Sequence, residues 1–276
     1  MGNRKSQGRR LGVQWRGKNV VITGASRGIG RSLALELARR GARMILTARS
    51  RPELESVAEL TRSLGADTVV VASDVSAADS ASEVVAAAAG QLGGVDVLVN
   101  NAGVGLRASV DQLARADLER VLAVNLLGPI AYIQAALPHF RRQGSGLIIN
   151  LSSLAGLMPV PHLGGYCATK HALVVLSRCL RAELREAGIR VMLVHPGAVD
   201  TDFRHHSLGS PFPSVPGRSR VSAEQVAVAI ARAAEDGRDE VFVRPLDRVL
   251  LATARLLPRR RDRILLRRYG RTGVRP

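Results

Sequence analysis

The feature that most constrains the fold is a repeated alternation of short apolar runs with longer segments rich in Ala, Leu, Glu and Arg. The runs are rich in β-branched residues and mostly continuous, which is typical of strands buried on both faces of a parallel sheet. They lie at Asn19–Thr23, Arg43–Thr47, Thr68–Val71, Val95–Asn100, Leu147–Leu151, Val191–Val194 and Glu240–Val243. Helices are expected near 29–40, 51–64, 77–92, 111–140, 167–187 and 222–235. This alternation predicts a single α/β domain, a doubly wound parallel sheet of about seven strands with helices on both faces.

Positive charge is concentrated at the two ends of the chain. Residues 1–18 carry six basic residues and no acid, and residues 248–276 carry ten arginines against Asp262. The rest of the chain therefore holds only +2 of the net charge of +17. We divide the sequence into a basic N-terminal extension (1–17), the α/β domain (18–245) and a basic amphipathic C-terminal extension (246–276). Nucleic-acid binding is not expected, because the body lacks the basic stripe that phosphate neutralisation requires.

The remaining composition points to a cytoplasmic protein. Cys167 and Cys179 are too few for a disulfide framework and suit a reducing compartment. No apolar run reaches transmembrane length, and the N-terminus lacks the apolar core of a signal peptide. The histidines show no metal-ligand spacing with cysteines or acids, so no metal is expected.

A glycine-rich turn follows the first predicted strand. The sequence TGASRGIG places Gly24, Gly28 and Gly30 between that strand and the start of a helix. Glycines at this point permit a tight turn and let a pyrophosphate approach the backbone N–H groups of a helix N-terminus. Such a turn alone is weak evidence for a dinucleotide site, because glycine also ends strands for backbone reasons only. Its place, in the first turn of the fold, favours a dinucleotide site.

Further motifs follow in order along the chain. They are SDV with Asp74, NNAG with Asn101, Ala102 and Gly103, VNLLG with Asn125, NLSSLAG with Ser153, YCATK with Tyr166 and Lys170, and HPGAVDT with Pro196, Gly197 and Thr201. With TGASRGIG, they make residues from about 18 to 245 resemble the short-chain dehydrogenase/reductase family. The resemblance implies a Rossmann fold, a nicotinamide cofactor, and a homodimer or homotetramer built on the helices near 111–140 and 167–187. It implies cofactor contacts from Gly24, Ser26, Gly28, Ile29, Gly30, Asp74, Val75, Asn101, Ala102, Gly103, Tyr166, Lys170, Pro196, Gly197 and Thr201.

The choice of nicotinamide cofactor can be argued from charge. An NAD site usually has an acid at the end of the second strand, where it holds the ribose 2′-hydroxyl. Here Ala48 takes that position and Arg49 follows, while Arg27 precedes Gly28 in the glycine turn. Two guanidinium groups could bind a 2′-phosphate through charge-assisted hydrogen bonds. The sequence therefore favours NADP(H). The alternative is that Arg27 and Arg49 are solvated surface arginines without a role in cofactor binding.

The catalytic candidates are Asn125, Ser153, Tyr166 and Lys170. Tyr166 and Lys170 are four residues apart and share one face of a helix. A free tyrosine has a pKa near 10, so we expect the adjacent ammonium to favour the tyrosinate. A compact, rotatable ammonium suits this position better than a guanidinium, and Lys170 is the only lysine after Lys18. Ser153 follows a neighbouring strand, where its hydroxyl could polarise a carbonyl. By resemblance, Lys170 also binds the nicotinamide ribose and Asn125 holds a water that relays protons to Lys170.

The substrate is expected to be a small hydrophobic carbonyl or secondary alcohol. Apolar residues Leu157, Met158, Val160, Pro161 and Leu163 follow Ser153, and Phe203, Leu208 and Phe212 lie in the long loop after Pro196. Tyr166 would be the general acid/base of an NADP(H)-dependent ketone reductase. The alternative is a catalytically idle NADP-binding protein, attached to a membrane surface or an acidic partner by its basic ends. Residues 246–276 fit an anionic membrane, an acidic protein such as an acyl carrier, or a cap over the active site or a subunit interface.

Overall fold

The computed structural model describes residues 12–212 and 220–269. Seven parallel strands form the central sheet, in the order β11-β7-β6-β4-β1-β2-β3. They are β1 (Asn19–Thr23), β2 (Arg43–Ala48), β3 (Thr68–Ala72), β4 (Val97–Asn100), β6 (Gly146–Leu151), β7 (Ile189–His195) and β11 (Glu240–Phe242). The order reverses direction between β1 and β4, which is the switch point of a doubly wound sheet. The predicted fold class, strand number and strand positions are confirmed.

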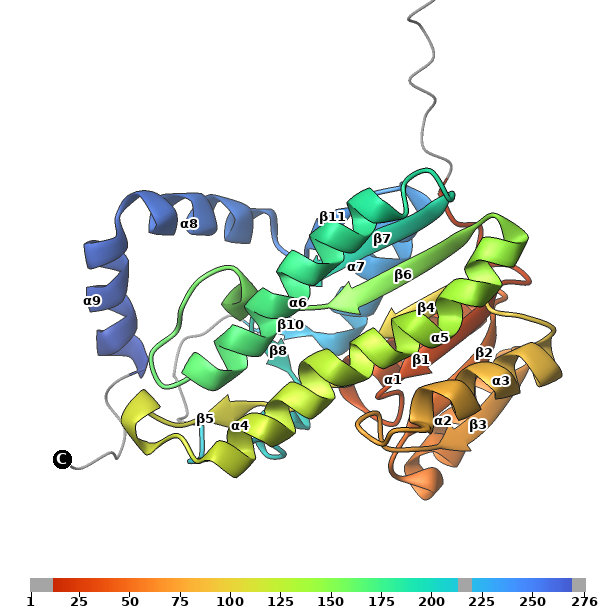
Figure 1. The fold of residues 1–276 in the computed structure, drawn as a ribbon, viewed down its shortest axis with the longest axis horizontal. Helices are drawn as coiled ribbons and strands as arrows, with labels where there is room; N and C mark the ends of the chain where they lie inside the picture. Colours follow the sequence, from red (N-terminus) through yellow and green to blue (C-terminus); the bar gives the residue numbers. More distant parts are fainter. Residues whose placement is uncertain (1–11, 213–219, 270–276) are drawn as a thin grey trace, which may run out of the picture.

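Helices cover both faces of this sheet (Figure 1). They are α1 (Gly28–Arg39), α2 (Arg51–Ser63), α3 (Ser80–Leu92), α4 (Arg115–Leu122), α5 (Gly128–Gln143), α6 (Gly164–Glu183), α7 (Ala223–Glu235), α8 (Pro245–Leu256) and α9 (Pro258–Tyr269). Side chains alternate along the strands: Val20 and Ile22 pack in one core with α1 and α7, whereas Val21 packs in the other with α3 and α5. Burial on both faces explains the continuous apolar runs in the sequence.

The helix expected at 111–140 differs from the prediction. Its first turn is a short 3₁₀ helix, η1 (Val110–Gln112), and a π turn, η2 (Ala123–Leu127), separates α4 from α5. Apolar periodicity continues through this turn, so the sequence pattern does not reveal it. Within the described residues, only the helix from Arg115 to Gln143 has the length and hydropathy of a membrane span, and its Tyr132 and Phe140 are buried in the core.

Short elements at the carboxyl ends of the strands complete the fold. The pairs are β5 (Leu106–Arg107) with β9 (Leu208–Gly209), and β8 (Val199–Asp200) with β10 (Val221–Ser222). Two 3₁₀ turns, η3 (Leu154–Gly156) and η4 (Asp202–Arg204), follow β6 and β8. The long loop expected after Pro196 thus contains β9, and residues 213–219 lie outside the described structure.

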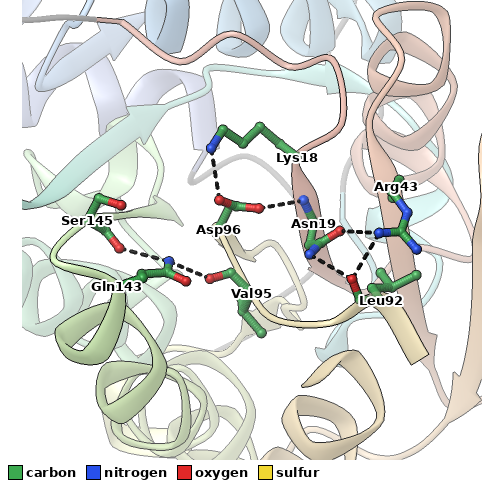
Figure 2. Close-up of polar contacts among 8 residues, drawn as sticks. All are labelled: Lys18, Asn19, Arg43, Leu92, Val95, Asp96, Gln143 and Ser145. Atoms are coloured by element: carbon green, nitrogen blue, oxygen red, sulfur yellow. Dashed lines mark hydrogen bonds and ion pairs between the residues drawn. The ribbon is translucent and has the colours of Figure 1, made fainter. Parts of the chain in front are cut away.

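A polar network joins the amino ends of the strands (Figure 2). Asp96 accepts hydrogen bonds from the Lys18 ammonium and the Asn19 backbone N–H, each at 2.9 Å. The Leu92 carbonyl accepts from the side chains of Asn19 and Arg43 at 3.0 and 2.9 Å. These contacts hold the amino ends of the strands together, whereas the predicted site residues lie at the carboxyl ends.

Part of the expected N-terminal extension packs on the domain. Trp15 is buried, and its indole N–H donates to the Ala231 carbonyl of α7 at 3.3 Å. The Val13 N–H donates to the Ala234 carbonyl at 3.0 Å. Trp15 is therefore part of the core, with Val13 packed against it, while the arginines and lysine at positions 4–10 lie outside the described residues.

Candidate active site

The glycine turn joins the carboxyl end of β1 to the N-terminus of α1. Gly24 and Gly28 adopt left-handed backbone conformations, with φ of +65° and +54°. A Cβ atom on Gly30 would lie 2.2 Å from the Gly24 carbonyl oxygen and 2.5 Å from the Asn101 amide nitrogen. That amide donates to the carbonyls of Thr23 and Gly24, each at 2.9 Å. Asn101 therefore braces the turn, which presents bare backbone at a helix N-terminus and fits the pyrophosphate of a dinucleotide.

The two arginines considered for NADP have different surroundings. Arg49 directly follows β2 and is exposed, and residues 48–50 contain no acid. Arg27 is half-buried and hydrogen-bonds through Nη1 with the Nε2 atom of His206 at 2.6 Å. This contact spans 179 positions of sequence, so no local pattern could have revealed it. Ser26 and Ile29, in the same turn, are half-buried.

Asp74 and Val75 follow β3. Arg120 of α4 donates to Asp74 Oδ2 at 2.8 Å, and the Ser76 hydroxyl and backbone N–H donate to Oδ1 at 2.6 and 3.0 Å. Burial alone would raise the pKa of Asp74, but these hydrogen bonds and the Arg120 charge outweigh it and hold the pKa at about 2. Asp74 is thus an oriented carboxylate that can still accept a bond from a ligand amino group.

The π turn brings Asn125 beneath the segment after β4. Its side-chain oxygen accepts from the Val104 N–H at 2.8 Å, and its amide nitrogen donates to the Val104 carbonyl at 2.9 Å and to the Thr169 hydroxyl at 3.2 Å. A Cβ on Gly103 would lie 3.3 Å from the Asn125 side-chain oxygen and 3.6 Å from Lys170 Nζ. The backbone at Gly103 therefore lies close to the side chains of both Asn125 and Lys170. π turns often occur at functional sites.

Ser153 lies just after β6, at the N-terminus of η3. Its hydroxyl accepts from the Ala155 N–H at 3.1 Å and lies 3.5 Å from the Pro196 carbonyl. It also forms a side-chain hydrogen bond with Tyr166, in the first turn of α6. The structure thus places these two hydroxyl groups together, although they come from different elements.

Lys170 lies one helical turn after Tyr166 and is 4% exposed. Its ammonium donates to the Leu151 carbonyl at 2.9 Å and lies 6.0 Å from the centroid of the Tyr166 ring. Burial lowers the pKa of Lys170 to about 8.

The net pKa shift of Tyr166 is opposite to the shift that an adjacent ammonium alone would give. We expected Lys170 to favour the tyrosinate, but burial raises the pKa of Tyr166 to about 12, despite the hydrogen bond from Ser153. The sequence shows the spacing of the two residues but not the depth at which the phenol lies. Tyr166 is consequently a protonated phenol at neutral pH.

The segment after β7 closes the site. The Thr201 methyl group would be 3.3 Å from a Cβ on Gly28, so this segment lies against the glycine turn. The Phe203 ring meets the Tyr166 ring edge-on at 6.0 Å between centroids. Pro196 is buried, and Gly197 lies near Leu154.

The apolar residues expected in the substrate pocket divide into two groups. Val160 is buried with Cys167 and Ala155, so it packs beneath the site. Met158 and Leu163 pack against this cluster next to Tyr166, and Leu157, Pro161, Leu208 and Phe212 are half-buried.

One feature that the sequence analysis missed is an ion pair near Gly197: Arg244 Nη2 lies 2.9 Å from Asp247 Oδ1, and Asp247 is 2% exposed. Their i, i+3 spacing around Pro245 was the available signal.

Comparisons with known proteins agree with this geometry. The family model for short chain dehydrogenases matches residues 18–209. A 3-oxoacyl-acyl-carrier-protein reductase of Staphylococcus epidermidis is 37% identical over 186 residues, which cover 67% of this chain and 76% of that protein. An alcohol dehydrogenase from the archaeon Thermococcus sibiricus, solved with 5-hydroxy-NADP, is 34% identical, with a TM-score of 0.73 over 81% of this chain and 94% of its own. A short chain dehydrogenase/reductase from Burkholderia phymatum, solved with NAD, is 28% identical, with a TM-score of 0.81 over 96% of this chain and 100% of its own. The chain therefore belongs to the short-chain dehydrogenase/reductase family of nicotinamide-dependent oxidoreductases, which act on alcohol and carbonyl groups.

Proposed function

We propose that this protein is an NADP(H)-dependent reductase of hydrophobic ketones. The observation that carries the proposal is the Tyr166 phenol, protonated at neutral pH, hydrogen-bonded to Ser153 and followed one turn later by the buried ammonium of Lys170. A protonated phenol suits reduction, which needs a proton donor at the carbonyl oxygen. A complete set of this kind argues against a catalytically idle NADP-binding protein.

The chain's own residues would hold the cofactor along the carboxyl edge of the sheet. The glycine turn, braced by Asn101, would bind the pyrophosphate at the N-terminus of α1. Asp74 would accept from the adenine amino group, with Val75 beside it. Ala102 and Gly103 would line the middle of the cofactor, Lys170 would bind the nicotinamide ribose, and Pro196, Gly197 and Thr201 would lie at the nicotinamide end. When bound, the reduced nicotinamide supplies the hydride.

Preference for NADP(H) over NAD(H) is supported by charge. Arg49 follows β2 with no acid beside it, and Arg27 is positioned in the glycine turn. Both can donate charge-assisted hydrogen bonds to a 2′-phosphate. Arg27 already contacts His206, so binding of the phosphate would exchange or share this contact. The solved relatives include complexes with 5-hydroxy-NADP, with NADP and with NAD, so the proposal of NADP(H) rests on the local charge.

The proton path begins at Tyr166. Ser153 orients and polarises the substrate carbonyl, and Tyr166 donates its proton to the carbonyl oxygen as the hydride arrives at carbon. The Lys170 ammonium stabilises the phenolate that forms. Both polar atoms of the Asn125 side chain bond to protein, so Asn125 fixes the Val104 backbone, and a relay water would use its backbone carbonyl.

The proposed substrate and assembly follow from exposed apolar residues. Met158, Leu163 and Phe203 lie next to Tyr166 and favour an apolar group on the ketone. Leu127 of η2 and Val175 of α6 are 58% and 59% exposed, which supports a homodimer or homotetramer built on α5 and α6.

The direct test supplies NADPH and a panel of hydrophobic ketones to the purified full chain. We expect ketone-dependent NADPH oxidation, lowered by about 10²–10⁴-fold in Tyr166→Phe. The matched control is Tyr132→Phe, which removes a buried hydroxyl bonded to Ser80 in the core, away from the site. Unchanged turnover in Tyr166→Phe would overturn the mechanism, and NADPH binding without turnover of any ketone would favour the idle protein.

A further inference from the structure

The C-terminal helices α8 and α9 form an arm at one end of the molecule. Figure 1 shows them as an L, with α8 leaving the body after β11 and α9 running from the far end of α8 in a different direction. Pro258 opens α9, which explains the corner, because proline suits the first turn of a helix but not its interior. We infer that this arm docks on an anionic membrane surface, with the apolar side chains of α8 in the lipid interface and the arginines of α9 on the headgroups.

The first observation is an apolar stripe on α8 that the described protein does not cover. Leu246, Val249, Thr253 and Leu256 follow the 3-4-3 spacing of one helix face. Leu246, Val249 and Leu256 are 65%, 58% and 79% exposed. Thr253 is exposed too, and its hydroxyl donates to the Val249 carbonyl at 3.2 Å. On the opposite face, Leu251 is buried.

The second observation is the basic face of α9. Arg259, Arg263 and Arg267 recur every four residues and are exposed. Exposed Leu266 and Ile264, at 54% and 53%, lie on the two flanks of this face. From 245 to 269 the sequence carries eight arginines and two aspartates, and both aspartates pair with neighbouring arginines.

Together the two faces fit a bilayer better than they fit a second copy of the chain or an acidic protein. Anionic headgroups attract the arginines, and the lipid interface accepts large apolar side chains next to them. A second copy of the chain would bring an arm of the same charge, so arginines would face arginines. An acidic protein would satisfy the arginines but leave the α8 stripe without a role.

The base of the arm lies at the active site. A Cβ on Gly197 would be 3.5 Å from the Asp247 carboxylate and 3.3 Å from Leu154, the residue after Ser153. Docking of the arm thus brings the carboxyl edge of the sheet close to the lipid, where a hydrophobic ketone would concentrate. This consequence rests on the proposed function, whereas vesicle binding needs no turnover, so the two can fail separately.

The test measures sedimentation of the full chain with vesicles. One set contains phosphatidylcholine alone, and the other contains about one third phosphatidylglycerol. We expect binding to the anionic vesicles at low salt, weaker binding at high salt, and little binding to the neutral set. Absence of binding to anionic vesicles at low salt overturns the inference.

Two pairs of arginine substitutions test the charge. Arg263→Gln with Arg267→Gln should weaken binding about 30-fold, since each arginine near the surface changes affinity several-fold. Arg39→Gln with Arg51→Gln removes the same charge from exposed positions on α1 and α2 and should leave binding within a few-fold of the parent. Equal losses in both pairs would show attraction by net charge and contradict a role of the arm.

Substitutions of exposed apolar residues distinguish the three candidate partners of the arm: a bilayer, an acidic protein and a second copy of the chain. Val249→Glu with Leu256→Glu should abolish vesicle binding, whereas Leu60→Glu with Leu64→Glu, at exposed positions on or next to α2, should not. If the α8 pair binds like the parent, the arm acts by charge alone, as for an acidic protein, and insertion is wrong. If the parent ignores vesicles and the α8 pair lowers the mass measured by light scattering, the stripe is an interface between copies.

Discussion

Replacing Lys170 by methionine removes one buried positive charge and keeps an unbranched side chain in its place. The ammonium lies 6.0 Å from the centroid of the Tyr166 ring. A unit charge at this distance stabilises a developing phenolate by ~3 kcal/mol at an effective dielectric constant of about 20. We therefore expect Lys170→Met to lower the rate of ketone reduction on the order of 100-fold. Thermal unfolding of the variant controls for damage to the fold.

The pH dependence gives this prediction a second readout. Since the pKa of Lys170 is lowered to about 8, the ammonium is charged below that pH and neutral above it. The parent should reduce ketone at a steady rate near neutrality and lose activity as the pH rises through about 8. Lys170→Met should be slow at all these pH values, without that decline. A variant that keeps the parent's pH profile would contradict the assignment.

Lys170→Arg keeps the charge and changes the shape. The Lys170 ammonium lies 3.6 Å from where a Cβ on Gly103 would stand, so a planar guanidinium meets the chain there. We expect most of the activity to be lost although the positive charge remains. An arginine variant as active as the parent would refute the reasoning, because charge alone would then suffice.

Three further predictions concern the cofactor site and its supports. Arg49→Ala should reduce the NADPH-to-NADH selectivity by about 10–100-fold, and unchanged selectivity would remove Arg49 from the phosphate site. Gly30→Ala should abolish cofactor binding in calorimetry, because its Cβ would lie 2.2 Å from the Gly24 carbonyl; normal binding would show that the turn can move. Asp74→Asn should cost ~1–2 kcal/mol in the free energy of unfolding at neutral pH, after discounting for partial exposure. Because the pKa of Asp74 is depressed to about 2, this stabilisation is present above about pH 4 and is lost as the pH falls toward 2. Urea unfolding of parent and variant near pH 7 and near pH 3 should show the difference shrinking, and a constant difference would contradict it.

Much of the fold could be predicted because the signals are local. Each buried strand appears as a continuous apolar run, and the motif residues after β1, β4, β6 and β7 meet because parallel strands end at one edge. The break at Asn125 could not be predicted, since the apolar periodicity of the two helices continues through the π turn.

What the sequence could not show depends on depth and on distant contacts. Burial sets the pKa of Tyr166 and of Lys170, and spacing along a helix does not report it. The contact of Arg27 with His206 joins segments that only the fold brings together. Asp247 near Gly197 is another such contact, and it links the arm to the active site.

The central claim is hydride transfer from NADPH to a ketone at the Tyr166 site, and isotope transfer measures it most directly. The full chain is incubated with NADPH deuterated at the nicotinamide C4 position and a hydrophobic ketone, and the product is analysed by mass spectrometry. The account predicts a secondary alcohol with deuterium on the carbinol carbon, formed by the parent and by Tyr132→Phe but not at a comparable rate by Tyr166→Phe. Deuterated alcohol formed equally fast by Tyr166→Phe, or NADPH bound with no ketone reduced, would contradict it.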